Sequence, residues 1–239
     1  MKTYDILFIH PPRTIKTDQV NRVKSGRTSF IFIPMGVFAI ADFLEREGFG
    51  VRIINYPLEQ YLNPNWSLKD YLKTIDFKIC GIDLHWIHNA HGAIEIARIV
   101  KEVKPNTKII LGGFSASYFH TQILKYYETI DGIIRGEGEI PFLKYAQSIH
   151  KNQDLDSIPN FSYRNASNHV RINPLSYTAK TLDNLNFTNI SLLKNAKRYF
   201  ECSRKIMGIS FNLPIGRGCP FNCPFCGGGQ RALKSLAGR

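Results

Sequence analysis

The chain has 239 residues, of which 44% are hydrophobic and 21% are charged. This composition suits one large globular domain, or one domain and part of a second, and it excludes a mainly disordered chain. The net charge is +12, from 31 Lys and Arg against 19 Asp and Glu, but the basic residues are scattered, so we expect a solvated basic surface and no nucleic-acid partner.

The N-terminus and the apolar runs exclude two kinds of membrane signal. Asp5 precedes the first apolar run and Pro11 ends it, which is not the pattern of a secretion signal. The longest apolar stretch, residues 30–41, contains a proline and a glycine and is shorter than the roughly 20 residues of a membrane-spanning helix. We therefore expect a cytoplasmic protein, where clustered cysteines bind metal or act in redox chemistry more often than they form disulfides.

Strand and helix signals alternate through the first half of the chain. We expect strands at Tyr4–His10, Val51–Tyr56, Ile79–Trp86, Lys108–Leu111 and Ile130–Arg135. We expect helices at Pro34–Arg46, Ser67–Ile75, Ala90–Val103 and Ile140–His150. This alternation predicts βαβ units in a doubly wound parallel sheet, an α/β domain over residues 1–150 whose ligand lies beyond the carboxyl ends of the strands.

The pattern changes after about residue 157. Two short strands are predicted at Asn160–Arg164 and His169–Ile172, and Asn173–Ser203 has few strong signals. We interpret residues 151–205 as a linker. A strand predicted at Met207–Pro214 and a helix that starts near Arg231 then indicate that a second domain begins within residues 206–239.

Three cysteines lie close together near the end of the chain. Cys219, Cys223 and Cys226 have the spacing C-x3-C-x2-C in a segment rich in glycine and proline. Three thiolates can ligate three irons of a 4Fe–4S cluster. A structural zinc site needs four ligands, and neither Cys202 nor His169 is near enough in sequence to complete a compact one. The motif therefore favours the iron–sulfur cluster.

This motif resembles that of the radical S-adenosylmethionine superfamily, in which an aromatic residue such as Phe225 precedes the last cysteine. The resemblance implies that the fourth iron binds S-adenosylmethionine. It also implies that an electron passed to the sulfonium of S-adenosylmethionine yields a 5′-deoxyadenosyl radical. It also implies an electron donor such as a flavodoxin or a ferredoxin. The other two cysteines stand alone, and we expect Cys80 in the core and Cys202 to be incidental.

The first 150 residues resemble the cobalamin-binding domain that precedes the radical S-adenosylmethionine barrel in corrinoid-dependent enzymes. The resemblance rests on four stretches at predicted strand ends, namely Ile6–Pro12, Gly81–Trp86, Leu111–Ser117 and Arg135–Glu139. Each alone fits ordinary βα-turn chemistry, but all four in order before the cysteine motif favour a cobalamin site. The candidate contacts are Gly81, Asp83, Leu84, His85, Gly112, Gly113, Ser115, Gly136, Glu137 and Gly138.

The residues after the first predicted strand depart from one known cobalt-binding motif. Cobalamin domains that ligate cobalt from below use Asp-x-His-x-x-Gly after the first strand, whereas this chain has His10-Pro-Pro-Arg-Thr-Ile15 there. The resemblance therefore implies cobalamin with its own base displaced and no histidine beneath the cobalt. His85, His88 and His91 lie near another strand end and could line the pocket.

The main hypothesis is a cobalamin-dependent radical S-adenosylmethionine protein, of the type that methylates an unreactive carbon. Only the first strand and the cluster loop of a barrel are expected here, so we expect this polypeptide alone not to turn over. A truncated corrinoid-binding module is one alternative. An RNA-modifying methylthiotransferase relative is another, although that family carries three further N-terminal cysteines and this chain has only Cys80 there. The sequence does not indicate the substrate.

Overall fold

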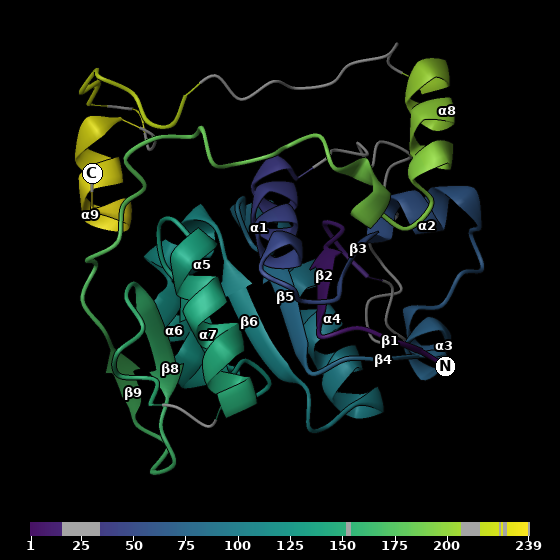
Figure 1. Cartoon of the computed structure of the whole chain (residues 1–239), viewed down its shortest axis with the longest axis horizontal. Coiled ribbons are helices and arrows are strands. Elements are labelled where there is room, and N and C mark those ends of the chain that lie inside the picture. The colour runs from purple at the N-terminus through teal and green to yellow at the C-terminus, as the bar shows by residue number, and fades with distance from the viewer. Residues whose placement is uncertain (16–33, 152–153, 207–215, 225, 227–228, 239) are drawn as a thin grey trace.

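The computed structural model describes residues 1–15, 34–151, 154–206, 216–224, 226 and 229–238. Its main sheet has seven strands in the order β3-β2-β5-β6-β7-β8-β9 (Figure 1). Their bounds are β2 Ile6–His10, β3 Val51–Asn55, β5 Ile79–Asp83, β6 Lys108–Gly112, β7 Gly132–Ile134, β8 Phe161–Arg164 and β9 Val170–Ile172. The strands from β3 to β7 in this order pair in parallel, whereas β8 and β9 continue the sheet antiparallel. A separate parallel pair joins β1 (Lys2–Thr3) to β4 (Ile75–Asp76).

Helices cover both faces of the sheet. One face packs against α1 (Met35–Arg46) and α7 (Glu139–Lys151). The other packs against α3 Leu68–Lys73, α4 Ala90–Val103, α5 Phe114–Tyr118 and α6 His120–Tyr126. Alternate strand residues supply the two cores, since Ile6 and Phe8 belong to the first and Leu7 and Ile9 to the second. The predicted doubly wound α/β fold is therefore confirmed.

The predicted elements differ from the observed ones mainly at the ends of strands. Helix α4 has the predicted bounds, and Ser67 caps α3 through its hydroxyl, which accepts from the Asp70 N–H at 3.2 Å. The strand predicted to reach Tyr56 ends at Asn55, whose side chain caps α2 (Tyr56–Leu62). Likewise β5 ends before the expected Trp86, and the short helix η1 (Ile87–Asn89) follows. Neither α2 nor the α5–α6 pair was expected, because short helices carry little periodicity.

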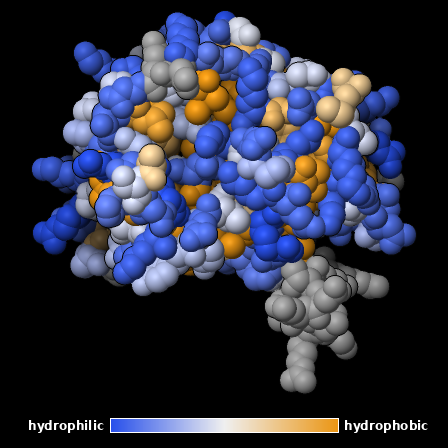
Figure 2. All heavy atoms as spheres, turned by 90° about the horizontal axis from the view of Figure 1, so that it is seen from below, coloured by the Kyte–Doolittle hydropathy of each residue, from blue (hydrophilic) through white to orange (hydrophobic). Residues whose placement is uncertain are grey.

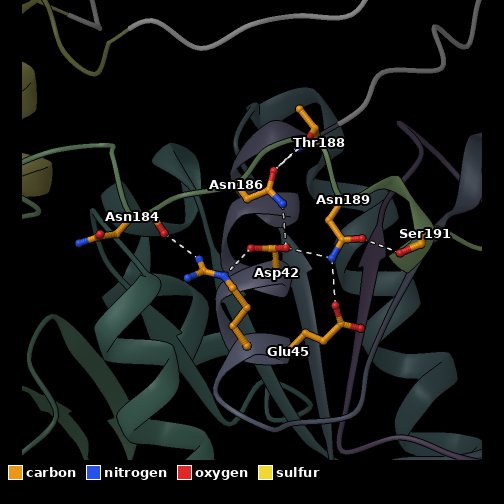
Figure 3. Close-up of polar contacts among 8 residues, drawn as sticks. Asp42, Glu45, Asn184, Asn186, Thr188, Asn189 and Ser191 are labelled. Atoms are coloured by element: carbon orange, nitrogen blue, oxygen red, sulfur yellow. Dashed lines mark hydrogen bonds and ion pairs between the residues drawn. The ribbon is translucent and has the colours of Figure 1, made fainter.

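The segment interpreted as a linker is fastened to the domain. Strands β8 and β9 belong to the main sheet, and η2 (Ile190–Leu192) and α8 (Ala196–Ile206) follow. The Asp42 carboxylate, 2% exposed on α1, accepts hydrogen bonds from Asn186 at 3.1 Å and Asn189 at 2.9 Å (Figure 3). We call residues 184–195 the strap. The domain boundary at residue 150 stays a prediction.

The buried Glu59 fastens the end of the strap. Its carboxylate, on α2, forms an ion pair with Lys194 and accepts from the Asn195 amide at 2.8 Å. Leu193 forms a parallel bridge with Ile53 of β3, and both side chains lie in the core. The strap is thus held by buried carboxylates as well as by apolar contacts.

The last described segment lies over the carboxyl ends of the strands. Helix α9 (Gln230–Ala237) contacts α5 and confirms the helix expected near Arg231 (Figure 1). Gly136 has a φ of +65°, and a Cβ added to it would lie 2.8 Å from the Ala237 Cα. Glycine at this position therefore permits the close approach of α9. The strand predicted at Met207–Pro214 lies outside the described residues.

The surface seen from below the view of Figure 1 is mostly hydrophilic, with separate small apolar patches (Figure 2). None of the helices in the described ranges is long and apolar enough to cross a membrane.

Candidate functional site

A cavity of about 860 Å³ opens at the carboxyl ends of β2, β5, β6 and β7. The first turn of α1 and parts of residues 217–237 complete its wall. The volume lies in the upper part of the range of roughly 300–1,000 Å³ for cofactor and ligand sites. Strands β2 and β5 are neighbours whose connections leave in opposite directions along the sheet, so the cavity lies at the topological switch point where such sheets bind ligands.

Most residues predicted from the strand ends line this cavity. They are Gly81, Asp83, His85, Gly112, Gly113, Gly136, Glu137 and Gly138. Leu84 and Ser115 do not belong to the described lining. Leu84 is 2% exposed in the core, and the Ser115 hydroxyl donates to the His85 carbonyl at 3.0 Å. Ser115 therefore positions a lining residue, and contact of any of these residues with a cofactor stays a prediction.

One part of the cavity, the apolar chamber, lies between the sheet and helices α1 and α7. Its lining residues, which belong to the core on that face, are Phe8, Val37, Ile40, Ile110, Ile134 and Phe142. A Cβ on Gly81 would lie 2.4 Å from the Phe8 ring, so a larger residue at this position would displace the ring from the cavity wall. These residues were not predicted, because in sequence they have the pattern of ordinary core positions.

The rim of the cavity is more polar. The His10 Nδ1 lies 3.0 and 2.8 Å from the two carboxylate oxygens of Asp83, and both side chains are mostly buried, at 13% and 16% exposure. His85 packs its ring against Trp86 and Phe114, with centroids 4.8 and 4.7 Å away. Burial lowers the pKa of His85 although Asp83 opposes the shift, so its neutral form is favoured.

The other two histidines of this region differ. His88 lines the cavity. The His91 Nδ1 accepts from the backbone N–H of Ile15 at 3.4 Å, and His91 is not in the described lining. Of the three histidines that could line the pocket, His85 and His88 therefore belong to the described lining and His91 does not.

Arg217 joins the cysteine segment to the cavity wall. It forms ion pairs with Glu139 and, at 3.7 Å, with Glu137, two carboxylates that follow β7. Leu233 and Ala237 of α9 also line the cavity. Arg217 was not predicted, since its only signal in the sequence is its place two residues before Cys219.

The cysteine loop is mostly exposed in its described residues. Cys219 is partly buried, Cys223 and Cys226 are exposed, and all three thiols are free. The Cys226 N–H donates to the Cys223 carbonyl at 3.1 Å, which makes a turn. Within the described ranges, however, no three His, Cys, Asp or Glu side chains gather in the geometry of a metal site. The donor set suits an iron–sulfur cluster, but the positions of the thiols do not yet form its cage.

The fold and the cavity define a class, a doubly wound domain with a cavity at its switch point that is large enough for an organic cofactor. Residues 24–146, just over half of the chain, match the family of the B12 binding domain. The chain belongs to this family, and cobalamin is the cofactor that the family is named for.

The chain is similar to parts of longer curated proteins. The chain is 27% identical to Uncharacterized methyltransferase PH0819 of Pyrococcus horikoshii, over 95% of this chain and 46% of that protein. It is 24% identical to the Hopanoid C-3 methylase of Methylococcus capsulatus, over 81% of this chain and 35% of the relative. The chain thus spans less than half the length of these curated relatives.

A solved structure shares the fold. The cobalamin-dependent S-adenosylmethionine radical enzyme OxsB, with aqua-cobalamin and S-adenosylmethionine bound, superposes with a TM-score of 0.57 at 17% identity. The match covers 77% of this chain and 24% of OxsB. At this identity the likeness concerns the fold alone.

Proposed function

We propose that the chain binds cobalamin with its base displaced into the apolar chamber, and that it forms the cofactor-binding part of a cobalamin-dependent radical S-adenosylmethionine methyltransferase. The proposal rests on one observation: a single cavity at the switch point has an apolar chamber and a polar rim. A flat aromatic base suits the chamber, and a corrin ring with polar side chains suits the rim.

The residues at the mouth fit a large ring. Among the described residues, an added Cβ on Gly36 would meet no atom within 4 Å, and one on Gly112 would meet the Ile134 carbonyl at 3.8 Å. Backbone is therefore exposed to the cavity at both positions, where a flat ligand can approach closely. The Ser115 and Ser117 hydroxyls hold the surrounding loops through the His85 and Gly113 carbonyls.

The cysteine loop supports the second half of the proposal through its donor chemistry. Cys219, Cys223 and Cys226 are free thiols at the C-x3-C-x2-C spacing, and they are the proposed ligands of a 4Fe–4S cluster that binds S-adenosylmethionine. When bound, cobalamin would supply a methyl carrier, and the cluster would supply the electron that cleaves S-adenosylmethionine to the radical that activates the acceptor. In this chain Arg217 would hold the loop against the cavity wall through Glu139.

The relatives support methyl transfer as the reaction class, since two of them are named a methyltransferase and a methylase. The acceptor, the cytoplasmic location and a flavodoxin or ferredoxin as electron donor are proposals that rest on the family resemblance. A corrinoid-binding module without turnover is the second candidate, and it is favoured by thiols that do not converge in the described residues.

A titration of the full chain with hydroxocobalamin, followed by absorption, tests cofactor binding. Cobinamide, which lacks the nucleotide and its base, should bind at least about tenfold more weakly, because it leaves the apolar chamber empty. Gly36→Trp should block the mouth and weaken binding, whereas Gly36→Ala, which adds only a methyl group that meets no described atom within 4 Å, should weaken it far less. No binding of cobalamin would exclude the proposal, and equal affinity for cobinamide would exclude the chamber as the site of the base.

Iron and sulfide analysis after anaerobic reconstitution separates the two candidates. Cluster in the wild type that is absent from a triple Cys219, Cys223 and Cys226→Ala variant favours the radical enzyme. Cobalamin binding with no cluster in either protein favours the corrinoid module.

A further inference from the structure

Helix α9 and Arg217 together close one side of the cavity, and we call them the flap. Leu233 and Ala237, which are buried on α9, line the cavity as Arg217 does. The helix lies over the carboxyl ends of the strands (Figure 1). A cofactor that enters or leaves the cavity through this face must therefore displace the flap.

The apolar contacts of the flap are small. Helix α9 packs on α5, and Ala237 lies so near Gly136 that a Cβ added to the glycine would be 2.8 Å from the Ala237 Cα. A helix of eight residues has little stability of its own in water, so α9 keeps its place only while it is docked. Docking therefore draws on polar contacts as well, and Arg217 makes a buried one.

Arg217 pairs with two buried carboxylates, yet the pairing is incomplete. Its Nη2 donates to the Oε1 of Glu139, and its Nη1 lies 3.7 Å from the Oε2 of Glu137. The two carboxylate side chains are 3% and 7% exposed. A guanidinium and a carboxylate often form two parallel hydrogen bonds. Here the Arg217 Nη1 and the Glu139 Oε2 are buried and have no hydrogen-bond partner among the described residues.

These two unpartnered atoms favour opening of the flap. A buried donor or acceptor without a partner keeps its full desolvation cost, and water reaches both atoms once Arg217 moves outward. Arg217 also stands between Gly216 and Gly218, and Gly218 has a φ of +90°, so glycine on each side lets the backbone turn. The charges thus hold the flap closed while the unpaired atoms limit how firmly they hold it.

We propose that the flap is a gate of the cofactor cavity and that the ion pair of Arg217 with Glu139 keeps the gate closed. The inference rests on the proposed function and goes beyond it, because it concerns the rates at which cobalamin enters and leaves and not its affinity. The gate is closed in the free chain and in the loaded chain, so entry and exit both wait for the same opening.

Stopped-flow absorption of the full chain with hydroxocobalamin tests the proposal. Arg217→Met keeps an apolar side chain and removes the guanidinium. Its association and dissociation rate constants should both rise about tenfold, with the dissociation constant changed less than about twofold, because the same opening limits both directions. Arg231→Met, which removes the same charge from an exposed position of α9, is the matched control and should leave both rate constants unchanged.

The carboxylate side of the ion pair gives a second test. Glu139→Gln keeps the shape of the side chain and an acceptor for Arg217 but removes the charge. Both rate constants should rise about threefold, since a hydrogen bond between two charged groups is roughly twice as strong as a neutral one. The double variant Arg217→Met/Glu139→Gln should be no faster than Arg217→Met, because the two changes remove one interaction. If Arg217→Met does not fold, unchanged rates in Glu139→Gln would overturn the gate.

The outcomes separate this inference from the proposed function. A rise in the dissociation rate constant alone would mean that Arg217 contacts the cofactor, since lost contacts act mainly on dissociation, and the gate would be wrong. Unchanged rates in Arg217→Met, or additive effects in the double variant, would contradict it as well. Wild-type protein that binds no hydroxocobalamin removes the proposed function and this inference with it.

Discussion

The cavity and the cysteine loop are both candidate cofactor sites, yet the protein builds them in different ways. The cavity is made by the ends of paired strands and by two packed helices, and its loops are tied by backbone hydrogen bonds such as Leu84 N–H to the Gly112 carbonyl at 2.7 Å. In its described residues, the cysteine loop is joined by short-range backbone hydrogen bonds such as Cys226 N–H to the Cys223 carbonyl at 3.1 Å, and its thiols are partly or fully exposed.

The difference shows what each site needs before its cofactor arrives. The hydrophobic burial of the domain stabilises the cavity whether or not a ligand is present. A cluster loop has no such support, because thiolates repel one another until metal neutralises them and binding free energy then orders the chain. We therefore expect the fold to determine the shape of the cavity and metal binding to determine the conformation of the cysteine loop.

The largest expected effect is complete loss of one site with retention of the other. In the triple Cys219, Cys223 and Cys226→Ala variant, iron and sulfide should fall to background, while the cobalamin dissociation constant changes by less than about twofold. Anaerobic iron analysis and an absorption titration measure the two quantities on one preparation. A large loss of cobalamin affinity in the variant would mean that the loop helps to form the cavity, which would break the comparison.

The second prediction damages the fold instead of the loop. Gly113 has a φ of +104°, and an added Cβ would lie 2.8 Å from the His85 backbone nitrogen. Gly113→Ala should therefore destabilise the domain by about 1–3 kcal/mol and lower Tm by roughly 3–10 °C, with weaker cobalamin binding. Calorimetry checks the shift. Gly36→Ala is the matched control, since its new methyl group meets none of the described atoms within 4 Å. An equal loss of Tm in both variants would show that crowding at residue 113 is not the cause.

The same contrast explains which parts of the molecule the sequence predicts. Strands β2, β3, β5 and β6 are apolar runs between turn residues, and α4 has a full apolar stripe, so local pattern was enough for them. Helix α2 was missed because Asn55 and Pro57, which start it, follow an apolar strand without a break. The strap is about as apolar as the whole chain, but the buried carboxylates that hold it, Asp42 and Glu59, lie far away in the sequence, so no local pattern indicates these contacts.

Prediction of the cavity had a similar limit. The glycines at the strand ends, such as Gly112 and Gly113, were found because turn chemistry is local. The chamber was not found, because Val37 and Phe142 look like core residues until the helices are placed around a space. The pairing of His10 with Asp83 depends on the order of strands, which brings distant residues together without any signal in their spacing.

The third prediction concerns the strap, which has more support from buried groups than the cysteine loop and less than the cavity. Asp42→Ala removes the carboxylate that accepts from Asn186, Asn189 and, at 2.8 Å, Arg46 (Figure 3). We expect a loss of about 1–2 kcal/mol and faster amide hydrogen exchange in residues 184–191, measured by mass spectrometry. Glu45→Ala, which removes a more exposed partner of Asn189, is the control and should change exchange less. Unchanged exchange in Asp42→Ala would show that apolar contacts alone hold the strap.

The smallest expected effect is the response of the sheet region to acid. His120 of α6 hydrogen-bonds the Ser162 hydroxyl of β8 at 3.0 Å, and burial, with a smaller contribution from Arg135, lowers its pKa from 6.5 to about 4. The unfolded chain therefore binds a proton at this histidine that the folded chain does not bind between these values. Stability from this residue is complete above pH 6.5 and is lost as the pH falls toward about 4. Because the ring is only half-buried, solvent screening keeps the effect small.

In His120→Gln, which keeps a hydrogen-bonding group but cannot titrate, Tm should decline less than in the wild type between pH 6.5 and 4.5. Parallel declines of Tm in the two proteins would assign the acid sensitivity of the domain to other groups.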